Sequence, residues 1–228
     1  MFLITILFSL FLYSCNSRDE EKALPVYDMY KVLEKEYTPY IPKFTPPVPG
    51  TYDLPVIKCI KNHAILDIYG REKDILSVKY GKIAVVSFIY TNCYDIYGCS
   101  MATYYMKLLD KEISESEELK DKVILISVSF DYERDTPKVM RKYMDLIKPS
   151  SNWYFFTTGG GKLLDDLLID FGQRIQKIYD ERGNWLGFRH TLKVYLLDEK
   201  NCIRNIYSTG MLYHKLIISD IKTLTMKK

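Results

Sequence analysis

Two nearly continuous apolar runs, residues 82–90 (KIAVVSFIY) and 122–130 (KVILISVSF), constrain the fold more than any other feature of the sequence. Both are rich in β-branched residues, which is typical of strands buried on both faces of a sheet. Between them, residues 100–118 place apolar side chains at helical spacing. A buried strand, a helix and a second buried strand therefore begin the predicted domain.

Shorter segments continue this alternation. They are a predicted strand at 64–69, a helix from Asp135-Thr136-Pro137 to about 147, a strand at 153–157, a helix at 162–171, a hairpin of strands at 191–197 and 203–208, and a helix at 212–226. This order predicts an α/β fold with a central mixed β-sheet flanked by helices. In such sheets reactive groups lie where strands end and helices begin.

The first fourteen residues are almost entirely apolar and carry no charged side chain. The run is shorter than the about 20 residues of a permanent transmembrane helix and fits a secretory signal peptide over residues 1–14. It ends at Ser14-Cys15, which resembles the processing site of bacterial lipoproteins. We therefore predict a lipid on Cys15 and an extracytoplasmic protein, anchored to a membrane on its periplasmic side. The alternative, a buried element with an incidental cysteine, is less favoured because charged residues follow at once.

Residues 15–52 are first charged and then rich in proline. Proline has no backbone donor and favours extended conformations. We therefore predict a stiff tether between the lipid and one domain at 53–228, although proline-rich arms also wrap the surface of a domain. A chain of 228 residues suits one domain with a tail.

The net charge is too weak to indicate a nucleic-acid partner. It is +3, from 32 basic and 29 acidic residues, whereas phosphate binding needs a concentrated basic face. The short basic clusters are interpreted as solvated surface.

Cys93 lies three residues beyond the strand predicted at 82–90, and Cys99 lies just before the next helix. The five residues between them include Gly98, and a loop of this length can bring both sulfurs together. A helix N-terminus after Cys99 favours the thiolate form. Thiolates select Cu(I), and an added imidazole keeps Cu(II) accessible. The pair is therefore a candidate for copper binding or for electron exchange.

His190 is the candidate third ligand. It immediately precedes the strand predicted at 191–197 and is expected at the end of a loop. A lone histidine is more often a surface or capping group. A fold that sets the loop before this strand against the cysteine loop would favour ligation instead.

Three segments, in order, resemble motifs of the SCO/SenC family over roughly residues 50–226. They are FIYTNC (88–93) with GCSMAT (98–103), SVSFDYERDTP (127–137) and HTLKVYLLD (190–198). The chain departs from the commonest pattern in two places: five residues rather than three separate Cys93 and Cys99, and Ser100 replaces the proline that commonly follows the second cysteine. Both changes leave the three ligand types intact.

This resemblance implies a thioredoxin-like fold and a copper chaperone rather than an enzyme. Members of the family are implicated in delivering copper to the copper centre of respiratory oxidases. By resemblance, Cys93, Cys99 and His190 are the copper ligands, for Cu(I), Cu(II) or both. The implied partner is a respiratory oxidase subunit or another cuproprotein.

Two other functions remain as alternatives. A thiol-disulfide oxidoreductase would use Cys93 and Cys99 as a dithiol pair, but the two-residue CxxC spacing is absent and His190 has no obvious duty in disulfide exchange. A peroxiredoxin-like peroxidase would need a Thr-x-x-Cys element, and Thr91-Asn92-Cys93 has the wrong spacing.

Asp131, Glu133 and Asp135 are also a candidate site for a hard cation. The favoured interpretation is structural. Asp135 is expected to cap the following helix, and the other two are expected to face solvent or to steady the cysteine loop.

The remaining candidates are assigned structural roles. Cys59 and Cys202 both flank turns and either pair or remain isolated, partly buried thiols, which is slightly preferred. His63 and His214 have no companion motif. Met101 could offer a thioether to copper, but its helical spacing favours core packing.

Overall fold

The two apolar runs form β4 (Ile83–Ile89) and β5 (Val123–Ser129), which pair in parallel from Ile83 opposite Val123 to Ile89 opposite Ser129. Every residue of both strands is buried. The computed structural model describes residues 24–36 and 44–226, so the predicted signal peptide and Cys15 lie outside the described residues. Within those ranges no helix has the length and apolar character needed to cross a bilayer.

β4 and β5 lie at the centre of an eight-stranded sheet with the order β1-β10-β9-β4-β5-β6-β2-β3. The parallel strands β4, β5 and β6 are flanked on both sides by antiparallel pairs, which confirms the predicted mixed sheet. The outer strands are β1 (Lys58–Cys59), β2 (Ala64–Asp67), β3 (Glu72–Asp74), β6 (Trp153–Thr157), β9 (Val194–Leu197) and β10 (Cys202–Tyr207).

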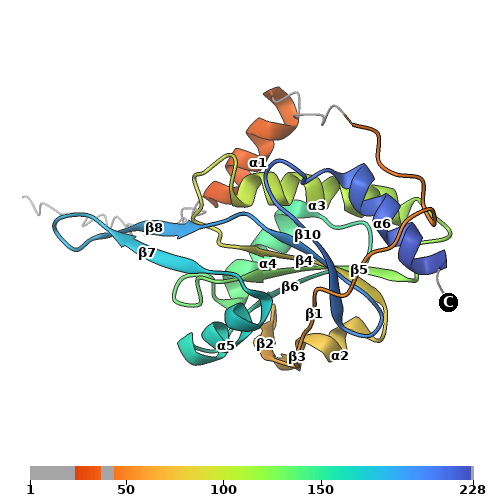
Figure 1. Cartoon of the computed structure of the whole chain (residues 1–228). Coiled ribbons are helices and arrows are strands. Elements are labelled where there is room, and N and C mark those ends of the chain that lie inside the picture. Colours follow the sequence, from red (N-terminus) through yellow and green to blue (C-terminus); the bar gives the residue numbers. More distant parts are fainter. Residues whose placement is uncertain (1–23, 37–43, 227–228) are drawn as a thin grey trace, which may run out of the picture.

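Helices cover both faces of this sheet (Figure 1). α3 (Cys99–Ser114) lies on the same face as α6 (His214–Met226), and α5 (Gly161–Phe171) and α2 (Ile75–Lys79) lie on the other. α4 (Pro137–Ile147) joins α3 through a hydrogen bond of 2.6 Å between the hydroxyls of Thr103 and Tyr143. The predicted helices are thus confirmed, with ends shifted by a few residues.

Part of the predicted tether is helical. Leu24, just before α1 (Pro25–Glu36), and Val26, Tyr30 and Leu33 within it are buried, and α1 packs along α3. The last three of these recur at helical spacing, so they share one face, and Pro25 stands at the first helical position, where its missing N–H costs nothing. Residues 25–36 therefore differ from the expected stiff, extended segment.

The proline-rich residues after this helix lie against α6. The Ser219 hydroxyl donates to the carbonyl of Pro47 at 2.5 Å, and the Gly50 N–H donates to the Thr223 hydroxyl at 3.1 Å. Phe44 packs edge-on against Tyr213. The described part of this arm wraps the domain, the alternative weighed for such sequences.

A two-stranded hairpin, β7 (Ile175–Tyr179) with β8 (Trp185–His190), extends away from the main sheet (Figure 1). Sequence periodicity did not predict it, because the residues of β7 are exposed or half-buried, those of β8 range from exposed to buried without alternation, and a register shift interrupts their pairing after Ile178. Gly187 in β8 has a φ of +152°, and a Cβ there would lie 3.2 Å from the Tyr90 hydroxyl. The hairpin therefore approaches the end of β4 closely, where a side chain would not fit.

Cys59 and Cys202 form a disulfide. The preference for isolated thiols was wrong, because the pairing of β1 with β10 sets these two cysteines directly opposite each other. Strand register across a separation of 143 residues is not visible in the local sequence.

Candidate metal centre

Cys93 and Cys99 occupy the loop that connects β4 to α3, as predicted. Both are free of disulfide bonds, and their exposed fractions are 1% and 0%. Asp95 turns the loop: its carbonyl accepts from the Gly98 N–H at 3.1 Å and its carboxylate accepts from the Tyr97 N–H at 2.9 Å. Because Cys99 is the first residue of α3, its sulfur lies at the helix N-terminus.

His190 meets this pair. Its Nε2 atom lies 3.6 Å from the Cys99 Sγ, and one ligand atom from each of Cys93, Cys99 and His190 lies within 4.8 Å of the others. The histidine is the last residue of β8, whereas the sequence placed it at the end of a loop. The expectation that folding brings these three residues together holds.

The geometry of the three ligand atoms fits a metal ion. An ion bonded at about 2.0–2.3 Å to each of three atoms would set those atoms roughly 3.5–4 Å apart, which is slightly closer than the observed spread of up to 4.8 Å. Small side-chain rotations would close that difference. The Nδ1 atom of His190 is buried with no hydrogen-bond partner in the described chain, so Nε2 is the nitrogen that faces the sulfurs.

Aromatic rings enclose the imidazole of His190. The ring of Phe130 lies 5.0 Å from it and that of Tyr90 lies 6.2 Å away, both edge-on. Phe188 packs against both of these rings at 5.1–5.2 Å. These contacts restrict the orientation of His190 and exclude water from one side of the centre.

The two thiols differ in their pKa values. A hydrogen bond with the Cys99 thiol, helped by one with His190, holds the pKa of Cys93 well below its usual value against the opposing effect of burial. Complete burial raises the pKa of Cys99, and the nearby Cys93 raises it further. Cys93 is therefore the cysteine present as a thiolate, which is the form that binds metals and attacks disulfides.

Asp135 does not cap α4. The cap is Thr136, whose hydroxyl accepts from the Val139 N–H at 3.4 Å. Asp135 is fully buried instead, and its carboxylate accepts from the Thr91 N–H at 2.8 Å, from the Ser129 hydroxyl at 2.5 Å and from the Thr91 hydroxyl. It joins the end of β5 to the residue that lies two positions before Cys93.

The other two acidic residues share one partner, since the Arg134 guanidinium lies 3.0 Å from Asp131 and 3.5 Å from Glu133. Asp131 is buried, so of the two expectations for it, facing solvent or steadying the cysteine loop, the first is wrong. Glu133 pairs with Lys177 of β7 at 2.5 Å. Within residues 24–36 and 44–226 these carboxylates are not gathered into a metal-binding group.

Replacing Asp135 with asparagine is expected to change how stability depends on pH. Burial raises the pKa of Asp135 from 3.8 to about 6, so the folded protein takes up this proton more readily than the unfolded chain. The titration of Asp135 therefore lowers the free energy of unfolding as pH rises from about 4 to about 6. At about 1.4 kcal/mol per pKa unit the total decrease is up to roughly 3 kcal/mol, and above about pH 6 this contribution no longer changes. Urea unfolding at pH 4, 5, 6 and 7 measures this. An equally steep fall in Asp135→Asn would contradict the assignment.

The remaining candidates lie outside this centre. His63 hydrogen-bonds the Asp170 carboxylate at 2.9 Å, and His214 begins α6, 4.0 Å from Glu112. Met101 is buried in the core, as its spacing predicted.

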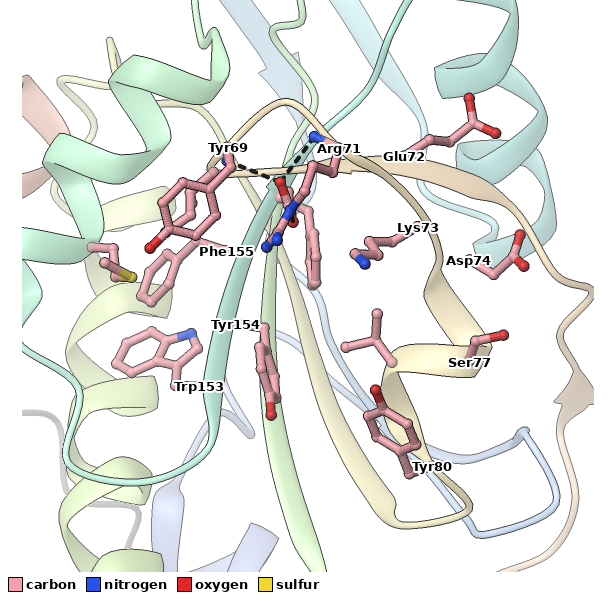
Figure 2. A pocket seen from close by; sticks show the side chains of 15 residues that line it. Tyr69, Arg71, Glu72, Lys73, Asp74, Ser77, Tyr80, Trp153, Tyr154 and Phe155 are labelled. Atoms are coloured by element: carbon pink, nitrogen blue, oxygen red, sulfur yellow. Dashed lines mark hydrogen bonds and ion pairs between the residues drawn. The ribbon is translucent and has the colours of Figure 1, made fainter.

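A cleft of about 510 Å³ opens at the metal centre, lined by Cys93 and His190 with Tyr97, Ile178 and Thr209 at its border. A larger cavity of about 630 Å³ lies at the far edge of the sheet, among β2, β3, α2 and β6 (Figure 2). Arg71 bridges to Asp67 there beside exposed Tyr154, and no cysteine or histidine lines it. The larger cavity therefore lacks sulfur and imidazole ligands, and cavity volume alone does not identify the candidate metal site.

A mixed sheet whose central strand runs through a cysteine loop into a helix defines a protein of the thioredoxin-like class. Residues 69–226 match the family model described as SCO1/SenC. The chain belongs to the SCO1/SenC family. This confirms the resemblance carried by the three motifs. No curated protein gives a significant match to the chain.

Solved structures of related proteins share this fold. A SCO1/SenC family lipoprotein from Bacillus anthracis has 24% sequence identity and a TM-score of 0.64, covering 76% of this chain and 99% of its own. ScoI from Bradyrhizobium japonicum, with copper bound, has 21% identity and a TM-score of 0.58, covering 73% and 99%. BsSco, described as a cytochrome c oxidase assembly protein with a disulfide switch, has 23% identity and a TM-score of 0.60, covering 78% and 100%.

Proposed function

We propose that the protein binds one copper ion through Cys93, Cys99 and His190 and delivers it to a cuproprotein, such as a subunit of a respiratory oxidase. The observation that carries this proposal is the gathering of two sulfurs and one imidazole nitrogen within 4.8 Å, from β8 and both ends of the β4–α3 loop. Two thiolates suit Cu(I), and the imidazole makes Cu(II) binding accessible as well. The copper-bound relative from Bradyrhizobium japonicum supports copper as the metal.

The positions of the ligands suit release as well as binding. Cys93 lies on a loop and borders the cleft, whereas Cys99 is fixed at the start of α3 and His190 is enclosed by rings. A partner's ligands can approach from the cleft, which both Cys93 and His190 line, and replace these ligands in turn. The copper ion is therefore cargo rather than a resident cofactor.

Titration of the reduced, metal-free protein with Cu(I) is expected to saturate at about one equivalent per chain. The reason is that the described residues contain one group of this kind. Metal analysis after desalting measures the stoichiometry, with a Cys93→Ser variant as the test of the ligand and the double variant Cys59→Ala, Cys202→Ala as the control, since it removes the disulfide-bonded cysteines and leaves no new thiol. Full copper retention in Cys93→Ser would overturn the assignment.

A thiol-disulfide oxidoreductase is the second candidate, favoured by the lowered pKa of Cys93 and by the free thiol of Cys99 beside it. The Cys93 thiolate would attack a partner's disulfide, releasing one partner thiolate and forming a mixed disulfide. Cys99 would then displace the second partner sulfur, which leaves the partner reduced and this pair oxidised. Reduction of a disulfide substrate by metal-free protein, unchanged in His190→Ala, would favour this activity over copper delivery.

We further propose that Cys15 carries a lipid that anchors the protein on the periplasmic side of a membrane. The support is the apolar run before Cys15 and the description of the Bacillus anthracis relative as a lipoprotein. Cell fractionation of the full chain and of a Cys15→Ser variant tests the anchor.

A further inference from the structure

Thr91 is the point at which the cysteine loop is held to the rest of the protein. It is fully buried two residues before Cys93, and each of its polar groups has a partner. The N–H and the hydroxyl donate to the Asp135 carboxylate, and the carbonyl accepts from the Val26 N–H at 3.0 Å. One support therefore comes from the β5–α4 turn and the other from the second residue of α1.

The same helix also contacts the element that carries the second cysteine. The buried face of α1 packs along α3, of which Cys99 is the first residue, and makes a smaller contact with α4 (Figure 1). Val26 is fully buried and Leu33, two turns later, is 1% exposed. α1 thus contacts both sides of the cysteine loop: the strand end before it and the helix after it.

We propose that α1 is a positioning element of the metal centre, acting through the hydrogen bond from the Val26 N–H to the Thr91 carbonyl. α1 lies outside residues 69–226, the part of the chain that matches the family model, so the family match does not account for it. The effect of α1 on copper retention rests on the proposed function. The effect of α1 on the exposure of the Cys93 and Cys99 thiols is independent of that function.

The physical reason is preorganisation. When the segment before Cys93 is fixed in advance, the free energy of metal binding is not spent on ordering it. Without the Val26 donor the Thr91 carbonyl is buried and unpaired, which favours local opening of the loop. Opening exposes Cys93 and separates its sulfur from Cys99 and His190.

The test replaces Val26 in the full chain by proline, which lacks the N–H, and by alanine, which keeps it. Proline is compatible with the first turn of a helix, so α1 is retained. In metal-free protein we expect amide exchange at residues 90–93 and alkylation of Cys93 by iodoacetamide to accelerate about tenfold or more in Val26→Pro and little in Val26→Ala. In Cu(I)-loaded protein, transfer to the chelator bathocuproine disulfonate is expected to accelerate by the roughly 10–100-fold typical of losing an outer-shell support.

A second pair of variants keeps the proposal testable if the proline variant does not fold. Leu33→Asp places a charge in the contact with α3 and is expected to produce the same accelerations, whereas Lys35→Asp places the same side chain on the exposed face of α1 and is expected to produce none. Unchanged exchange and alkylation rates in Val26→Pro and Leu33→Asp would overturn the proposal. If Cys93 is alkylated faster in the α1 variants but the native protein binds no copper, the positioning role of α1 is supported and the copper function is refuted.

Discussion

Replacing His190 with alanine is expected to reduce the affinity of the protein for Cu(II) more than 100-fold, and its affinity for Cu(I) by a smaller factor. The imidazole is the one nitrogen ligand of the three, with Nε2 lying 3.6 Å from the Cys99 sulfur. Losing a direct ligand costs more than the roughly 10–100-fold that follows loss of an outer-shell partner. Two thiolates alone still suit Cu(I) but not Cu(II).

Competition titrations with chelators of known affinity for each oxidation state measure both values. His214→Ala is the matched control, because it makes the same substitution at a largely buried histidine outside the metal centre. An equal loss in both variants would indicate a general loss of structure. Undiminished Cu(II) binding in His190→Ala alone would remove the histidine from the ligand set.

Removing the disulfide by the double substitution Cys59→Ala and Cys202→Ala is expected to lower the free energy of unfolding by about 2–5 kcal/mol. The bond closes a loop of 143 residues that includes β4, α3 and β5, so its loss frees a large part of the unfolded chain. The metal centre lies on other elements, and copper stoichiometry should remain at one per chain. Urea unfolding and metal analysis on the same samples measure the two effects.

The single variants provide the control for this experiment. Cys59→Ala and Cys202→Ala each break the bond, so each should lose nearly as much stability as the double variant, and the two losses should not add. Losses that add would show that the side chains act independently. A double variant as stable as the native protein would show that the bond contributes nothing.

The central strands and the cysteine loop were predictable because their signals are local. The apolar runs of β4 and β5 and the helix after Cys99 are each contained in one short segment. Placing His190 in the centre depended on recognising its motif as well, because no short-range pattern joins residue 190 to residue 93. The family resemblance supplied that long-range contact.

The features that sequence analysis missed depend on contacts between distant segments. The β7–β8 hairpin, which carries His190, has an irregular register and is held in part by the Arg134 guanidinium, 3.6 Å above the ring of Trp185. The Cys59–Cys202 bond depends on which strand forms the edge of the sheet next to β10. Asp135 was assigned as a cap because Asp before Thr-Pro fits that role, but the hydroxyl of Thr136 takes it and leaves the carboxylate free to hold Thr91.

The bond between β1 and β10 means that one molecule carries an oxidised cysteine pair and a reduced one. Any reductant that reaches Cys93 and Cys99 therefore also meets this second pair, in which Cys59 is exposed whereas Cys93, Cys99 and Cys202 are buried. Shielding cannot protect that bond. Strand pairing favours its recovery instead, because Cys59 and Cys202 stay opposite each other after reduction, so that an oxidant that removes two electrons and two protons re-forms the bond between the same two residues.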